Sequence, residues 1–163
     1  STPDGAEFGE AWSTRWQLAA DAANLYVRVS CRAPRSVAGE EDPKLAADDH
    51  VVVMLEPRRA WPTQKFFVGA HGQTWHENRT PSRDHRWRAE VQRDAEGWQA
   101  ILTIPWECLR DADLGERPVR LNVSRSVPEK GTLAWRAHQP LRRRLIFGDD
   151  NPQDYGWAIF QEQ

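Results

Sequence analysis

Long apolar runs are absent from this sequence of 163 residues, and so is a large excess of either charge. No stretch approaches the roughly 18 uninterrupted apolar residues that a membrane helix requires, so we expect a soluble chain without a membrane partner. The 22 basic and 24 acidic side chains leave a net charge of only −2, which creates no strong field to attract nucleic acid. The sequence therefore predicts neither a membrane nor a nucleic-acid partner.

Motifs of common catalytic sites and cysteine frameworks are also missing. The chain has no GxSxG nucleophile motif, no HExxH zinc motif and no glycine-rich phosphate loop, so we expect a protein that is not an enzyme. Its only cysteines, Cys31 and Cys108, belong to no CxxC or zinc-ligand spacing. One disulfide and two small buried thiols both fit this pattern, so the sequence leaves their pairing open.

The sequence does contain segments in which apolar and polar side chains alternate with a period of two. One example is the segment in which the apolar Trp16 and Leu18 are separated by a polar residue. Residues 50–57 are apolar almost throughout, which predicts a central strand buried on both faces. Strands are predicted at residues 14–20, 24–31, 50–57, 64–70, 87–92, 98–105, 119–126, 132–137 and 155–160. With one helical turn at 106–112, this density of strands predicts a single all-β domain over residues 1–163, an antiparallel β-sandwich of jelly-roll or immunoglobulin type.

An ordered series of segments resembles the family 9 carbohydrate-binding modules and their DOMON-like relatives. The segments are DAANLYV from Asp21, DDHVVVMLEP from Asp48, FFVGAHGQ from Phe66, EGWQAILTIPWECL from Glu96, LNVSR from Leu121 and YGWAIF from Tyr155. The resemblance covers most of the chain. It implies a β-sandwich that is attached to, or derived from, secreted enzymes.

The resemblance also implies a site in which two tryptophan rings enclose a sugar while a Glu, an Arg and amide side chains bind its hydroxyls. Here the position of one clamping Trp falls near Ala46, that of the Glu on Val52 and that of the Arg near Phe67. These side chains cannot take the family roles, and the loop before Tyr155 contains no tryptophan. Function must therefore be argued from this chain's own site residues.

Tryptophan is abundant, with nine residues, and each large ring needs either a core or a ligand to cover it. Rings in register with apolar strand positions, or beside a strand-ending proline, are predicted to be core, namely Trp16, Trp98, Trp106 and Trp157. Trp61 and Trp75 lie in or beside predicted turns, where they either stack on a sugar or cap the ends of the sandwich. For Trp135 the sequence leaves both a core position and a binding-site position open. The candidate carbohydrate-binding residues are Trp61, Trp75, His71, His76, Glu77, Asn78 and Trp135.

No cofactor is expected. A transition-metal site at His71 and His76 would need both side chains on one side of a turn and a third ligand, and their spacing does not demand one. Related modules use calcium structurally, and oxygen ligands are available in one acidic cluster, but its spacing is not that of a calcium loop; the cluster consists of Asp149, Asp150, Asn151 and Asp154. Some DOMON-like domains bind haem through a methionine, and Met54 keeps haem as a minor alternative.

These observations predict a non-catalytic carbohydrate-binding module, extracellular or periplasmic, that targets an attached or partner enzyme to polysaccharide. A different interpretation follows from the missing family Trp, Glu and Arg. On that interpretation, the chain is a structural or interaction domain of a larger surface protein and has no sugar ligand.

Overall fold

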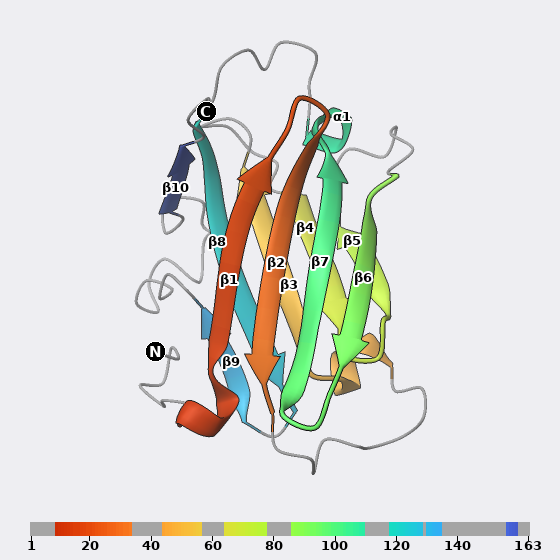
Figure 1. Cartoon of the computed structure of the whole chain (residues 1–163), viewed down its shortest axis with the longest axis vertical. Helices are drawn as coiled ribbons and strands as arrows, with labels where there is room; N and C mark the ends of the chain where they lie inside the picture. The colour runs from red at the N-terminus through yellow and green to blue at the C-terminus, as the bar shows by residue number, and fades with distance from the viewer. Residues whose placement is uncertain are drawn as a thin grey trace, which may run out of the picture.

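The computed structural model describes residues 9–33, 44–56, 64–77, 86–109, 118–128, 130–134 and 156–159, with the backbone alone at 46, 118–119, 133–134 and 156–159. Two antiparallel β-sheets face each other in the described part of the chain, as Figure 1 shows. No helix among the described residues is long and apolar enough to cross a membrane. The predicted all-β sandwich is confirmed.

Sheet A has the strand order β1-β2-β7-β6. Its strands are β1 (Thr14–Ala20), β2 (Asn24–Arg32), β6 (Arg88–Arg93) and β7 (Gly97–Pro105). Sheet B has the order β10-β8-β3-β4-β5, and β9 pairs with β8 outside this path. Its strands are β3 (His50–Glu56), β4 (Gln64–Gly69), β5 (Thr74–Glu77), β8 (Pro118–Val127), β9 (Gly131–Ala134) and β10 (Gly156–Ile159).

Three short helical pieces accompany the strands: η1 (Glu10–Trp12), η3 (Leu45–Ala47) and α1 (Trp106–Leu109). The helical turn predicted after β7 is confirmed in α1, whose Trp106 ring nitrogen donates to the Asp21 carbonyl oxygen at 2.8 Å. Together these pieces cover the two ends of the sandwich in Figure 1, with α1 at one end and η1 and η3 at the other.

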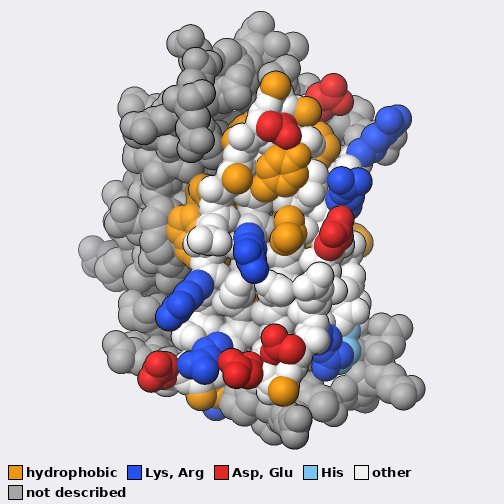
Figure 2. All heavy atoms as spheres, viewed as in Figure 1, with side chains coloured by type: hydrophobic (Ala, Val, Ile, Leu, Met, Phe, Trp, Pro, Cys, Tyr) orange, Lys and Arg blue, Asp and Glu red, His pale blue; other side chains and the backbone are white. Residues whose placement is uncertain are grey.

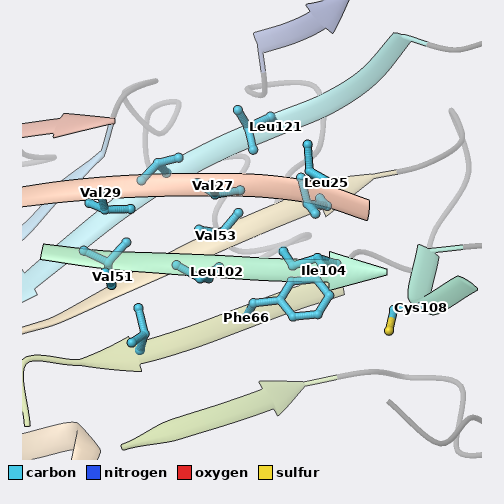
Figure 3. Close-up of a cluster of buried hydrophobic side chains, with 14 of the residues drawn as sticks. Leu25, Val27, Val29, Val51, Val53, Phe66, Leu102, Ile104, Cys108 and Leu121 are labelled. Carbon is cyan, nitrogen blue, oxygen red and sulfur yellow. The ribbon is translucent and has the colours of Figure 1, made fainter. Parts of the chain in front are cut away.

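The core lies between the two sheets because alternate residues of each strand turn inward. In β2 the residues Leu25, Val27 and Val29 are buried, and in β3 the residues Val51 and Val53 face them from the other sheet (Figure 3). Burial on both faces of β3 is confirmed only in its second half, since Met54 and Glu56 are buried but His50 and Val52 are partly exposed.

A buried polar cluster crosses between the sheets near one end of the sandwich. Arg125 of β8 donates through Nε to Asp49 Oδ1 at 2.7 Å, and the ring nitrogen of Trp98 on β7 donates to Asp49 Oδ2 at 2.9 Å. Arg125 also donates to the carbonyl oxygens of Trp12 and Arg32, both at 3.0 Å. The cluster therefore ties sheet B to η1 and to β2 and β7 of sheet A.

Both cysteines are buried, reduced thiols. Cys31 pairs with Trp98 near the end of β2, whereas Cys108 follows the opposite end of β7 in α1, beyond Ile104 in Figure 3. The length of a strand separates the two thiols, so they form no bridge.

The core predictions for tryptophan are confirmed for Trp98 and Trp106, which are buried, while Trp16 is partly buried and packs against the core. The side chains of Trp135 and Trp157 lie outside the described residues.

Candidate functional site

The tight hairpin between β4 and β5 presents the most exposed aromatic ring of the described residues. Gly72 adopts a φ of 90°, which favours glycine, and the Gly69 amide donates to the Gln73 carbonyl oxygen at 2.9 Å to close the turn. Trp75 follows on β5 with 62% of its surface exposed. The sequence places Trp75 in or beside a turn, and the structure places it on β5 just after one.

Trp75 belongs to a cross-strand row on the outer face of sheet B. In the antiparallel register Trp75 lies opposite Phe67, and Phe67 lies opposite Val52 on its other side. Phe67 and Val52 are only partly buried, so the row is an apolar strip open to solvent at its Trp75 end. Side chains directly opposite in such a pair are about 4.5 to 5.5 Å apart at Cβ, so these groups form one surface.

Polar groups flank the row on both sides. The next pair along the same face is Lys65 and Glu77, joined by an ion pair of 3.2 Å. On the other side, the His50 ring lies 6.3 Å from the Phe67 ring, centroid to centroid, and its Nδ1 donates to the Asp48 carbonyl oxygen at 2.9 Å. Donors and acceptors that bind sugar hydroxyls therefore border the apolar strip.

Asp48 fixes the hairpin that carries Trp75. Its buried carboxylate accepts from the His71 backbone amide at 3.0 Å and from His71 Nδ1 at 2.9 Å. A Cβ on Gly69 would lie only 2.6 Å from Asp48 Oδ2, so the carboxylate fits there because residue 69 is glycine. His71, a predicted site residue, therefore anchors the turn through Asp48.

His76 is separated from Trp75 because successive residues of a strand face opposite sides. The His76 ring stacks on the core residue Phe66 at 4.4 Å between centroids with 9° between planes, and its Nε2 donates to Gln64 Oε1 at 2.9 Å. Trp87 meets Phe66 edge-on at 5.3 Å on the same side. The structure thus brings Glu77 together with Trp75 on the outer face but not His76.

Other predicted positions lie outside the described residues. These are Trp61 and Asn78, the side chain of Trp135, and the acidic cluster of Asp149, Asp150, Asn151 and Asp154. Within the described ranges no group of three or more His, Cys, Asp or Glu residues is arranged to hold a metal ion. Met54, considered as a haem ligand, is a buried residue of β3.

The positions that the family resemblance singled out converge on this same surface. Val52 and Phe67, which stand where the resemblance implies a hydroxyl-binding Glu and Arg, are opposite each other, and Phe67 is opposite Trp75 on its other side. Sequence reasoning missed Phe67, His50 and Lys65 as neighbours of Trp75. The alternation of residues along β3 and β4 indicates which face of the sheet these three side chains occupy. Only the pairing of the strands shows that they lie close to Trp75.

One further buried ionisable group lies on the outer side of β3. Burial raises the pKa of Glu56, and Arg120 of β8, whose Nη1 donates to Glu56 Oε2 at 3.5 Å, lowers it in part. Glu56 and Arg120 are opposite each other in the pairing of β3 with β8.

Comparisons with known proteins identify solved structures with a similar architecture. No protein-family model matches the sequence, and no curated protein matches it. A family 9 carbohydrate-binding module from Caldicellulosiruptor kristjanssonii in complex with glucose is similar, with a TM-score of 0.72, 13% identity, and coverage of 98% of this chain and 81% of that one. The complex of such a module from the same organism with cellotriose has a TM-score of 0.67 at 13% identity, covering 94% of this chain and 76% of that one.

A third similar structure is that of a protein from Bacteroides uniformis proposed to bind carbohydrate. Its TM-score is 0.64 at 13% identity, with coverage of 90% of this chain and 77% of that one. At this identity the likeness concerns the fold, and it confirms the fold that the sequence resemblance implied. The chain has the β-sandwich fold of the family 9 carbohydrate-binding modules.

Proposed function

We propose that this chain is a non-catalytic carbohydrate-binding module whose sugar-binding surface is the outer face of sheet B around Trp75. The observation that carries the proposal is the 62% exposure of Trp75 at the end of a row shared with Phe67 and Val52. A ring of this size in water is costly unless a ligand covers it, and an indole face packs well against the C–H face of a pyranose.

The polar border of the row supplies the second half of sugar recognition. Glu77 retains 43% of its side-chain exposure while paired to Lys65, so the pair is accessible to a hydroxyl group. His50 is partly exposed at the other side of Phe67. Stacking on Trp75 and hydroxyl contacts with these neighbours together fit one sugar unit or the end of a chain.

The similar structures support this choice of ligand class, because two of them are complexes with glucose and with cellotriose. The proposed contacts with the sugar differ from those that the family resemblance implies, since the side chains of Val52 and Phe67 cannot form hydrogen bonds with hydroxyl groups. We further propose that the module acts outside the cytoplasm and brings an attached or partner enzyme to its polysaccharide.

The test is affinity electrophoresis and calorimetry of the whole chain against neutral glucans, xylans and mannans. Trp75→Ala should weaken binding to the preferred glycan at least tenfold, a loss of about 1.4 kcal/mol. Thr74→Ala is the matched control, because Thr74 is exposed on the same strand but alternates to the other side. Absence of binding across the panel, or equal binding by Trp75→Ala, would favour a structural or interaction domain instead.

A further inference from the structure

The outer face of sheet A is a second open surface, and it is the face turned to the viewer in Figure 2. Hydrophobic side chains gather over one part of it, and basic side chains cross its middle. Tyr26 of β2 lies there between Ala19 of β1 and Thr103 of β7, its partners in the strand register. Both neighbours have small side chains, and Tyr26 is partly exposed.

The Tyr26 ring is held in one orientation by its hydroxyl group. The hydroxyl donates to Asp21 Oδ2 at 2.8 Å and accepts from Asn24 Nδ2 at 3.3 Å. Asp21 is itself fixed by the turn, since its Oδ1 accepts from the backbone amides of Ala23 and Asn24 at 2.8 and 2.7 Å. A ring fixed before binding loses little conformational entropy when a ligand stacks on it.

A chain of hydrogen bonds beside this ring leaves donors facing solvent. Arg28 Nη2 donates to Gln99 Oε1 at 2.9 Å, and Gln99 Nε2 donates to Gln92 Oε1 at 2.9 Å. Both amide oxygens are thus used as acceptors inside the chain. The remaining groups at its two ends are the N–H donors of Arg28 and Gln92, which favour a ligand rich in acceptor oxygens.

The charged side chains on this face also favour a ligand with acceptor oxygens, in particular a negatively charged one. Exposed arginines at positions 15, 28 and 88 project from β1, β2 and β6. Glu90 is the one carboxylate among the outward-facing residues of the four strands of sheet A, β1, β2, β6 and β7. None of these four side chains forms an ion pair with a described residue. Arg32, the fourth outward arginine, pairs with Glu96 at 3.7 Å. The central part of the face therefore carries a net positive charge.

We propose that the outer face of sheet A is a second glycan-binding surface that takes a polysaccharide bearing uronate carboxylates. The sugar ring stacks on Tyr26, and its carboxylate accepts charge-assisted hydrogen bonds from Arg28. Residues two apart on a strand are separated by about 7 Å, so ring and guanidinium serve one sugar unit or its neighbour. Ile101, which is 41% exposed opposite Arg28, extends the apolar platform.

This surface is independent of the Trp75 surface, because the two lie on opposite outer faces of the sandwich. The test uses polygalacturonate and its fully methyl-esterified form, which share a backbone and differ in charge. We expect the whole chain to bind the acid at least tenfold more tightly than the ester. Trp75→Ala should keep this binding within twofold, which separates the second surface from the first.

Substitutions on the outer face of sheet A test whether polygalacturonate binds there. Arg28→Gln and Tyr26→Ala should each weaken binding of polygalacturonate at least tenfold, with circular dichroism confirming that both remain folded. Arg93→Gln removes the same charge from an exposed residue that alternates to the other side of β6, and it should change binding less than twofold. Polyglutamate tests simple attraction between charges, since it carries carboxylates without sugar rings.

The proposal would be overturned by no binding of polygalacturonate, by equal binding of its methyl ester, by equal competition by polyglutamate, or by equal losses in Arg28→Gln and Arg93→Gln. Loss of binding in Trp75→Ala alone would assign the acidic polymer to the first surface and overturn it as well.

Discussion

Asp49 and Arg125 form a fully buried ion pair with two parallel hydrogen bonds, from Arg125 Nε to Oδ1 at 2.7 Å and from Nη2 to Oδ2 at 2.5 Å. The side chains are 0% and 1% exposed. Burial, the largest single influence, lowers the pKa of Arg125, but the hydrogen bonds to Asp49 together with the neighbouring charges outweigh it, and the pKa is raised. The guanidinium is therefore held in its charged form between the two sheets.

Removal of either partner should destabilise the fold strongly, because the other charge stays buried without compensation. We expect Arg125→Leu and Asp49→Leu each to lower the free energy of unfolding by about 3–5 kcal/mol. The double variant should lose less than the sum of the two. Urea unfolding of all four proteins gives this coupling, and additive losses would show that the pair does not act as a unit.

Gly97 should tolerate no side chain, since a Cβ there would lie 2.0 Å from the Cys31 carbonyl oxygen. The added methyl group in Gly97→Ala would push β7 away from β2 where the two strands pair at Gly97. We expect this change to lower the free energy of unfolding by more than about 1 kcal/mol. Gly9→Ala is the control, because nothing lies within 4 Å of a Cβ at Gly9. Thermal unfolding of both variants compares them directly, and similar midpoints would contradict the close approach.

Stability should depend on pH through Glu56, whose pKa burial raises from an ordinary value of 4.5. The folded chain holds this proton more tightly than the unfolded chain, so the stabilisation is complete below 4.5 and is lost as pH rises through the folded pKa. Relative to the wild type, Glu56→Gln should therefore gain stability as the pH rises above 4.5. Urea titrations at several pH values measure this difference, and a trend of opposite sign would refute it.

The two thiols should be unreactive in the folded protein. Burial is the main cause that raises the pKa of Cys31 to about 12, so almost no thiolate exists near neutral pH. Cys108 is 4% exposed. We expect no labelling by dithionitrobenzoate in buffer and release of two thiols after addition of guanidinium chloride, whereas rapid labelling without denaturant would contradict the burial.

Most strands could be predicted because their inward residues alternate at a period of two, as Leu25, Val27 and Val29 do. β5 could not, since its residues TWHE carry no apolar alternation and are placed only by pairing with β4. The cluster around Asp49 was missed for a related reason. Arg125 is 76 residues away along the chain, and no local pattern announces such a contact.

The candidate site was predictable in part. Trp75 was identified from its polar surroundings, and its exposure agrees with a role on the surface, although sugar binding by Trp75 stays a prediction. Sequence proximity grouped His76 with Trp75, but alternation along β5 turns His76 toward Phe66. Phe67 and His50 join Trp75 only through the register of three strands, which the sequence does not specify.

The central claim is that a sugar stacks on Trp75, and the most direct measurement is fluorine NMR of protein labelled with 5-fluorotryptophan. The Trp75 resonance is assigned by its loss in Trp75→Phe and then followed during titration with the preferred neutral glycan. We predict that this resonance shifts along the binding curve measured by calorimetry while the resonance of buried Trp98 stays in place. Saturation of binding with an unmoved Trp75 resonance would contradict the account.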